Sequence, residues 1–468
     1  MRSPGADAGY GALRDYFRLP DCFLDGIVTT VDPLSDDVGF FQFGPANICY
    51  GRSRAGVAPR PDDASTFDAS DAVSGASGSL RLPFSFSEVI DHLRLEHYRP
   101  DGVQGPELFA GSELIRTLYY LLREWLPVPV RRHLQKVYFY DWRSIRFPTW
   151  PVDFTVDNLH EEFLRLLLQR SGTDRVPFIW FWPNGAPNCL MMTHDVETAD
   201  GRDFTSQLMD LDESHGIKAS YQVIPEKRYE VPDEYVRGIR ARGFEFNIHD
   251  LNHDGHLYKE RREFERRAAR NNGYVRQYGA RGFRAGAMYR KQDWYDVFEF
   301  SYDMSVPNVA HLEPKRGGCC TVMPFFIGNI LELPLTLAQD HSLFHILDDY
   351  SLGVWKQQLD LIRRRHGLMS FITHPDYLID RQARAVYVAL LEHLEQMTTQ
   401  EQVWSATPGD VDEWWRARHK MALVPRAQGW EIVGPGCERA RLAYAVLDGS
   451  RVVYELAGVP EVSTSNVQ

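Results

Sequence analysis

The feature that most constrains the fold is a repeating pattern that begins near Pro187. From there to about residue 405, short apolar or β-branched runs alternate with longer amphipathic segments. This alternation is typical of βα units that assemble into a parallel sheet. We therefore predict an α/β fold with a distorted (β/α) barrel over residues 186–420. Strands are expected at 190–195, 218–223, 244–249, 282–285, 302–304, 330–337, 368–374 and 402–404, and helices at 258–276, 350–365 and 381–397.

The rest of the chain predicts smaller units around this barrel. Residues 1–52 are expected to form an N-terminal accessory segment rich in β-structure, because 39–51 mix aromatic residues with Gly and Pro. Residues 53–79 are nearly all small, Pro or charged, which is typical of a flexible linker or loop. We expect a helical accessory region at 80–185. Residues 421–468 should form a small C-terminal β-hairpin appendage, since Asp-Gly separates two alternating runs there.

Charge and cysteine usage narrow the function classes. The chain has 52 basic and 64 acidic residues and a formal net charge of −12, which disfavours nucleic acid as a partner. Its 6 cysteines show no CxxC spacing, which disfavours a disulfide scaffold or a zinc finger. Residues 1–50 lack the pattern of a secretory signal, so we expect a cytoplasmic protein.

Carboxylates follow the first expected strand of the barrel. If the chain stays extended through Glu197, then Thr193, Asp195 and Glu197 project from one face of the strand. Barrel enzymes keep their active sites at such carboxyl ends of strands. The alternative is that these acids only begin the next helix, where a negative charge is favourable.

Two histidines four residues apart, His249 and His253, follow another strand. On a helical turn this spacing places both imidazoles on one face, where they could bind one divalent ion with a carboxylate as third ligand. The alternative is a pair of solvent-facing histidines at a helix start. Further strand ends add Arg284, Asp303 and His374. Together, these side chains supply metal ligands, a base, an orienting cation and an acid at one rim of the barrel.

Four of these segments resemble, in order and spacing, the motifs of the polysaccharide deacetylases with a NodB-homology domain, carbohydrate esterase family 4. The resemblance is carried by residues 193–197, 249–253, 283–286 and 372–375, and it covers 186 to about 405. It implies the distorted barrel of that family. It also implies a hydrolase that uses one divalent metal ion, Zn²⁺, to remove an N-acetyl group from a sugar in a glycan or polysaccharide precursor.

The resemblance implies a role for each motif residue. Glu197, His249 and His253 would be the metal ligands, Asp195 the catalytic base, and His374 the catalytic acid. Arg284 would keep Asp195 ionised and oriented. The family's first motif has adjacent acids, whereas Val196 separates Asp195 from Glu197 here, so these two carboxylates could exchange roles.

The remaining candidates concern the substrate. The family has an Asp that tunes the late His, and Asp303 and Asp340 compete for that position. Asp340, His341, Tyr289 and Asp303 are the expected substrate-binding residues, since they lie near the motifs and aromatic faces can stack on sugar rings. The rival hypothesis is a catalytically decayed glycan-binding or scaffold protein of a polysaccharide-assembly system.

Residues 114–136 predict contact with a membrane surface. Apolar and aromatic residues there precede a basic cluster that includes Arg131 and Arg132. This arrangement suits an interfacial helix and, with it, a lipid-linked glycan as substrate at the inner face of the membrane. The alternative is a helix packed on the barrel with its basic end in solvent.

Overall fold

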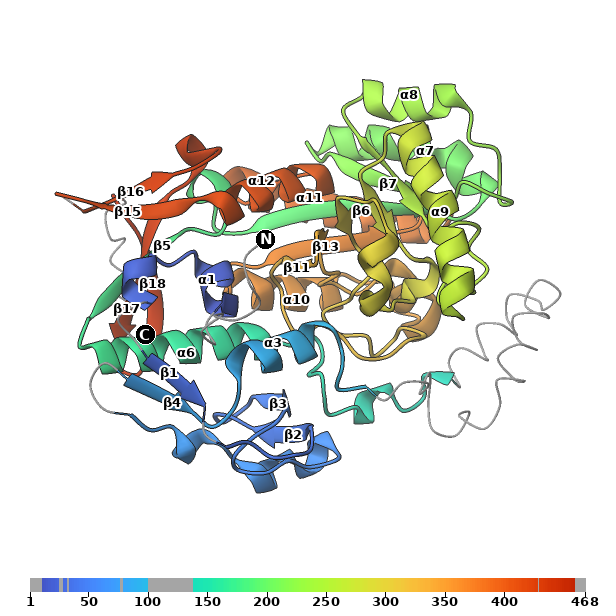
Figure 1. Ribbon diagram of the computed structural model, residues 1–468. Coiled ribbons are helices and arrows are strands. Elements are labelled where there is room, and N and C mark those ends of the chain that lie inside the picture. Colours follow the sequence, from blue (N-terminus) through green and yellow to red (C-terminus); the bar gives the residue numbers. More distant parts are fainter. Residues whose placement is uncertain are drawn as a thin grey trace.

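The computed structural model describes residues 11–24, 28–31, 33–75, 79–99, 138–427 and 429–458. It confirms an α/β fold built on a curled, half-barrel sheet of nine strands (Figure 1). All pairings in this sheet are parallel except that of β11 with β12. In spatial order the strands are β11 (Phe325–Ile327), β12 (Ile330–Glu332), β10 (Tyr302–Asp303), β9 (Gly282–Arg284), β8 (Glu245–His249), β7 (Ala219–Val223), β6 (Cys189–Val196) and β13 (Leu368–Thr373), and β14 (Trp404–Ser405) also pairs with β6.

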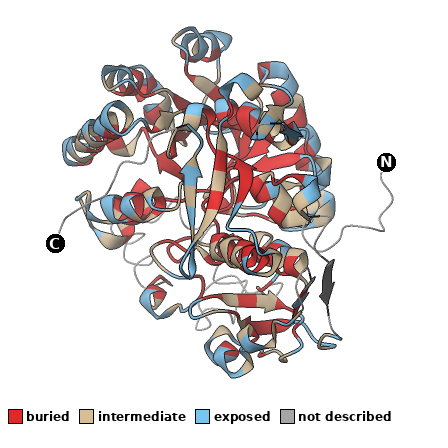
Figure 2. Cartoon of the chain, turned by 90° about the vertical axis from the view of Figure 1, so that its left-hand side faces the viewer, coloured by how far each residue is buried: buried red, intermediate tan, exposed pale blue. Residues whose placement is uncertain are grey.

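Helices surround this sheet, so its central strands are buried on both faces. Every residue of β6, β7 and β13 is buried, as expected for parallel strands that are covered on both faces, and this includes polar residues such as Thr193, Ser220 and Gln222. In Figure 2 the strands of the large sheet are mostly buried, whereas the helices expose their outer faces. The helices are α7 (Ala199–Ser214), α8 (Asp233–Ala241), α9 (Arg261–Tyr278), α10 (Gly353–Arg363), α11 (Arg381–Gln400) and α12 (Pro408–Lys420).

The sheet is closed by an irregular segment rather than by a regular strand. The sequence predicts a strand over 330–337, but β12 ends at Glu332. Pro334 has no amide proton, but pairing with the neighbouring segment continues past it, since the Leu335 amide donates to the Val306 carbonyl at 3.0 Å. Beyond it, the Thr336 hydroxyl donates to the Leu368 carbonyl at 2.7 Å, and the Leu337 amide donates to the Ser370 carbonyl at 3.3 Å. These bonds join the segment after β12 to β13, which gives the barrel its distorted form.

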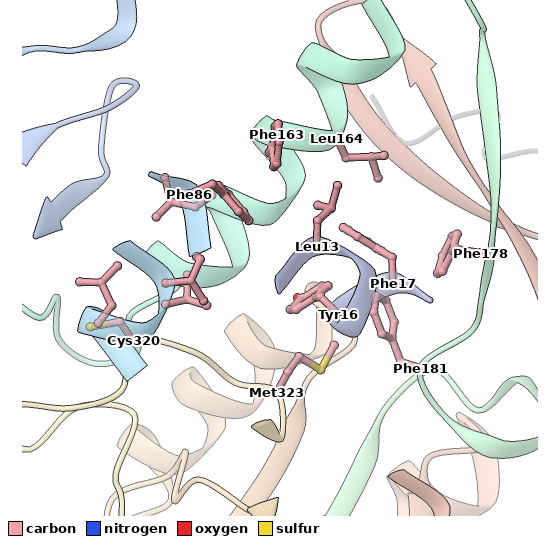
Figure 3. Packing of buried hydrophobic residues seen from close by; sticks show 14 of the residues in the cluster. Leu13, Tyr16, Phe17, Phe86, Phe163, Leu164, Phe178, Phe181, Cys320 and Met323 are labelled. Carbon is pink, nitrogen blue, oxygen red and sulfur yellow. The ribbon is translucent and has the colours of Figure 1, made fainter. Parts of the chain in front are cut away.

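The N-terminal part packs against this barrel through a shared core. It contains α1 (Gly11–Phe17), α2 (Asp21–Leu24), α3 (Phe86–Arg94) and α6 (Thr155–Ser171), together with the antiparallel pair β2 (Gly39–Gln42) and β3 (Ile48–Gly51) and the parallel pair β1 (Val28–Val31) and β4 (Ser79–Leu82). Figure 3 shows Phe17 of α1 among Phe178, Phe181 and Leu164, and Met323 closes the lower side of the cluster. The hydrophobic core is therefore continuous between the accessory region and the barrel.

The segment expected to be a flexible linker or loop packs against β2. Its described residues, 53–75, include two 3₁₀ helices at Pro61–Phe67 and Ser70–Ala72. Ala58, Ala64 and Ala69 are buried, and the Phe40 and Ala58 backbones exchange two hydrogen bonds of 2.7 Å. The small side chains here allow the backbone to pack closely. The same composition is also found in flexible segments, so the sequence alone does not distinguish the two cases.

The C-terminal part contains the expected hairpin, formed by β17 (Leu442–Asp448) and β18 (Arg451–Leu456). Gly449, at φ +60°, occupies its turn. A third strand, β5 (Arg175–Ile179), pairs with β17, so this sheet draws on the region expected to be helical. A separate pair is formed by β15 (Ala422–Arg426) and β16 (Gly429–Val433).

The segment 114–136, expected to contact a membrane, lies outside the described residues. Among the helices that the structure does describe, none combines the length and the apolar character needed to cross a membrane.

Candidate metal and catalytic site

The carboxyl ends of β6, β8, β9 and β13 carry the candidate residues to one rim of the barrel. Along β6, successive side chains alternate as the sequence predicts. Thr193 and Asp195 both accept hydrogen bonds from the Arg284 guanidinium, at 2.7 Å each. His194 points to the other face, where its Nε2 lies 3.0 Å from Asp212 Oδ2. The alternation therefore separates the site residues from a structural histidine.

The two histidines of the second motif do not lie on a helical turn. Residues 250–255 are irregular, and both Asp250 and His253 have a φ of +54°. The Arg228 guanidinium stabilises this conformation by donating to the Asn252 carbonyl at 3.3 Å and to the His253 carbonyl at 2.8 Å. The imidazole rings of His249 and His253 still converge, with centroids 5.0 Å apart. The expected helical geometry is thus wrong, although the two rings lie side by side.

Glu197, His249 and His253 together fit a divalent metal ion. Glu197 Oε1 lies 2.9 Å from His253 Nε2 and 3.6 Å from His249 Nε2. Two ligand atoms of a tetrahedral zinc site are separated by roughly 3.3–3.5 Å, because each lies about 2 Å from the ion. Both Nε2 atoms are buried and make no hydrogen bond among the described residues. His249 Nδ1 lies 3.2 Å from the Arg284 carbonyl, a contact that leaves its Nε2 lone pair for a metal.

Asp195 lies beside this cluster and is held by Arg284. Its Oδ2 is 3.8 Å from His249 Nε2, and its Oδ1 accepts from the Arg284 guanidinium. Arg284 is fully buried and also donates through Nε to the Met304 carbonyl at 3.0 Å. Burial alone would raise the pKa of Asp195, but Arg284, His249 and His374 outweigh it and lower that pKa. Asp195 therefore stays ionised at neutral pH, as a base must.

His374 follows β13, the neighbour of β6 in the sheet, and is held by Asp340. His374 Nδ1 is 2.7 Å from Asp340 Oδ1, and its backbone amide donates to Asp340 Oδ2 at 2.7 Å. Its Nε2 lies 3.6 Å from Glu197 Oε1. Burial alone would lower the pKa of His374, but Asp340 and then Glu197 raise it well above its ordinary value. Asp340 therefore favours the protonated form of the imidazole. Asp340, not Asp303, occupies the position for which these two residues compete in the sequence.

The expected substrate-binding residues differ in their burial and in the groups that they contact. Asp340 is fully buried and orients His374, so it does not line a binding surface. Asp303 is also buried, and it accepts from the Tyr295 hydroxyl at 3.0 Å and from Ser305 Oγ at 2.8 Å. His341 is half-buried, with its ring centroid 6.4 Å from that of His374. Tyr289 is half-buried on the loop that follows Arg284.

One further carboxyl group near the site is missed by the sequence reasoning. Glu313 is only 7% exposed and lies on an irregular segment between β10 and β11. Burial raises the pKa of Glu313 to about 7, with a smaller raising effect of Asp195 and opposing effects of Gln339, Arg290 and His374. Irregular backbone has no periodicity, so no pattern in the sequence singles this residue out.

No family model and no curated protein matches the sequence. Solved structures that resemble it include a protein assigned to the polysaccharide deacetylases from Mycobacterium smegmatis, with 16% identity over 51% of this chain and 93% of that one and a TM-score of 0.41. The structure of PuuE allantoinase has 12% identity over 50% of this chain and 92% of that one, with a TM-score of 0.40. A third resembling structure is that of a protein from Bordetella bronchiseptica assigned as a polysaccharide deacetylase involved in O-antigen biosynthesis. It has 16% identity over 50% of this chain and 86% of that one, with a TM-score of 0.29. Because these identities and TM-scores are low, a function for this chain has to rest on its own side chains.

Proposed function

We propose that this protein is a metal-dependent hydrolase that removes an N-acetyl group from a sugar in a glycan or polysaccharide precursor. The observation that carries the proposal is the convergence of three separate sets of side chains. Two histidines and Glu197 form a ligand cluster, the ionised Asp195 lies 3.8 Å from His249 Nε2, and His374, whose protonated form Asp340 favours, lies 3.6 Å from Glu197 Oε1.

This arrangement supplies what amide hydrolysis requires. Glu197, His249 and His253 would hold a divalent ion, which would polarise an acyl carbonyl and make water more acidic. The Asp195 carboxylate is placed to accept a proton from the attacking water, and Arg284 keeps it ionised and oriented. His374 Nε2 is placed to donate a proton to the departing amine, because Asp340 holds its other nitrogen. Each proton transfer thus has a residue with the required protonation state.

Acetate release tests the proposal directly. Zinc-loaded protein would be incubated with a panel of N-acetylated monosaccharides, polymers and lipid-linked glycans, and acetate would be measured for wild type and Glu197→Gln. We expect wild type to release acetate from at least one class of substrate and Glu197→Gln to release none. If wild type releases no acetate from any of them but still binds one, the decayed glycan-binding protein is the better description.

We also propose a lipid-linked or nascent glycan as the natural substrate, met at the cytoplasmic face of a membrane. The support is the apolar and basic sequence of residues 114–136. Comparing acetate release from a lipid-linked and a soluble form of the same N-acetylated sugar tests this part of the proposal separately.

A further inference from the structure

The imidazole of His374 takes part in a closed cycle of contacts with three neighbouring residues. Its Nδ1 lies 2.7 Å from Asp340 Oδ1, which also accepts from the His341 amide at 2.7 Å. His341 Nδ1 lies 2.9 Å from the Tyr377 hydroxyl. The Tyr377 ring in turn stacks on the His374 imidazole, with centroids 4.7 Å apart and an angle of 28° between the two planes. The imidazole therefore has two separate restraints, a hydrogen bond at Nδ1 and an aromatic ring against its face.

These two restraints act on different movements of the imidazole. The second torsion angle of a histidine side chain has a broad range, so one hydrogen bond to Nδ1 leaves the ring able to turn about that bond. Such a turn moves Nε2, the atom that would donate the proton. Tyr377 opposes it, because its ring lies against the imidazole face at a separation typical of stacked aromatic pairs. With both restraints, Nε2 stays directed towards Glu197, whose Oε1 lies 3.6 Å away.

Tyr377 is itself held by groups at several points. Its amide donates to the His374 carbonyl at 3.1 Å. The His345 ring packs against the Tyr377 ring at 90°, with centroids 4.4 Å apart. His341 and His345 both belong to a helical segment that begins directly after Asp340. The segment that carries the hydrogen-bond partner of the imidazole thus also carries two side chains that contact Tyr377.

The alternative is that Tyr377 only fills space, as most aromatic residues do. Its neighbour Leu378 has that role, since it is fully buried in the core of the barrel. Tyr377 is half-buried, and its ring contacts lie with three histidines. These contacts favour a role for Tyr377 in the site over one in the core.

We propose that Tyr377 is a positioning residue for the catalytic acid, with its ring fixing the plane of the His374 imidazole. The catalytic consequence rests on the proposed function. A proton donor acts in the transition state, so a misdirected Nε2 lowers kcat and leaves KM nearly unchanged. Misplacement of a reacting group by about 1 Å can lower a rate by about 10²-fold.

The test compares Tyr377→Leu, which removes the ring, with Tyr377→Phe, which keeps it. Tyr350→Leu is the matched control, because Tyr350 is also half-buried and stacks on Phe344 with centroids 4.9 Å apart. Zinc-loaded, full-length protein with ¹³C-labelled histidine gives the NMR order parameter of the His374 Cε1–Hε1 bond, and His374→Ala identifies the signal. This parameter should fall in Tyr377→Leu and stay at the wild-type value in the other two variants.

Acetate release on the same preparations gives kcat and KM. In Tyr377→Leu, kcat should fall by about tenfold or more with KM within about twofold of wild type, and Tyr377→Phe should recover most of the loss. Zinc content and circular dichroism should match wild type. If Tyr377→Leu does not fold, His341→Ala/His345→Ala replaces it, since this variant removes two side chains that contact Tyr377. It should lower the same order parameter, and an unchanged value there would contradict the proposal.

The outcomes separate the positioning role from the proposed function. An unchanged order parameter in Tyr377→Leu overturns the positioning role. A lower order parameter with unchanged kcat also overturns it and leaves the hydrolase intact, and a raised KM with unchanged kcat would mean that Tyr377 binds the sugar instead. If wild type releases no acetate, the hydrolase fails, while the order parameter still decides whether Tyr377 fixes the imidazole.

Discussion

Replacing Asp195 by Asn isolates the role of its charge. The substitution keeps an oxygen that can accept from Arg284 Nη1 and hardly changes the side-chain volume. It removes the negative charge that a base needs, while Glu197, His249 and His253 are left untouched. We expect zinc to remain bound and kcat for acetate release to fall by about 10²–10⁴-fold, the usual contribution of a general base.

The same substitution should lower the free energy of unfolding. A charge-assisted hydrogen bond contributes about 1.5–3 kcal/mol and a neutral one about 0.5–1.5, so the Asn variant should lose about 1–2 kcal/mol. Because the folded protein lowers the pKa of Asp195, its ionisation stabilises the fold above the unfolded pKa of about 3.9. The difference in the free energy of unfolding between wild type and the Asn variant should therefore be largest at pH 7 and should shrink as the pH falls below about 4.

Three measurements on one preparation test these expectations: zinc content, kcat, and urea denaturation at pH 7 and well below pH 4. Glu197→Gln is the matched control, and it should lose zinc. If Asp195→Asn loses zinc while Glu197→Gln keeps it, the two carboxylates have the opposite roles. An Asn variant with wild-type kcat would remove Asp195 from the mechanism.

Four other changes have definite expected results. His253→Ala should lose most bound zinc by elemental analysis while keeping its circular dichroism spectrum, because it removes a ligand. His374→Ala should keep zinc and lower kcat by about 10²-fold or more, and unchanged turnover would exclude it as the acid. Burial lowers the pKa of His160 to about 3, whereas in the unfolded chain this histidine becomes protonated below about pH 6.5. Acidification should therefore lower the free energy of unfolding by up to about 5 kcal/mol. His160→Gln should unfold at a lower pH than wild type, and an equal midpoint of acid unfolding would contradict this. Wild type should float with anionic liposomes, whereas Arg131→Glu/Arg132→Glu should stay at the bottom of the gradient, and wild type that also stays there would end the membrane hypothesis.

The barrel strands could be predicted because the signal for each is local. In β6 an apolar run is followed by Asp195 and Glu197, and in β8 a similar run ends in His249. The order of these strands, and the polar residues at their carboxyl ends, could therefore be predicted. Parallel topology then brings these ends to one edge, which is why separate motifs could be expected to meet.

Other features of the site and the fold depend on contacts between segments that are distant in the sequence, so no local sequence pattern predicts them. The role of Asp340 follows from its bonds to His374, 34 residues away, and nothing in its own neighbourhood distinguishes it from Asp303. The turn that carries His253 depends on the Arg228 guanidinium, 25 residues earlier in the chain. Residues 53–75 are ordered by packing against β2, whereas their composition is that of a loop.

The accessory region is bonded to the loops around the candidate site. Glu96 and Arg290 form a buried ion pair, with Arg290 Nε 2.6 Å from Glu96 Oε2, and the Gly318 amide donates to Glu96 Oε1 at 2.6 Å. Arg290 lies six residues after Arg284, and Gly318 ends the segment that carries Glu313. A buried ion pair that loses one partner costs about 3–5 kcal/mol, so the loops around the site depend on Glu96 for their stability. The loops around the candidate ligand cluster therefore depend on the region that precedes the barrel to keep their conformation.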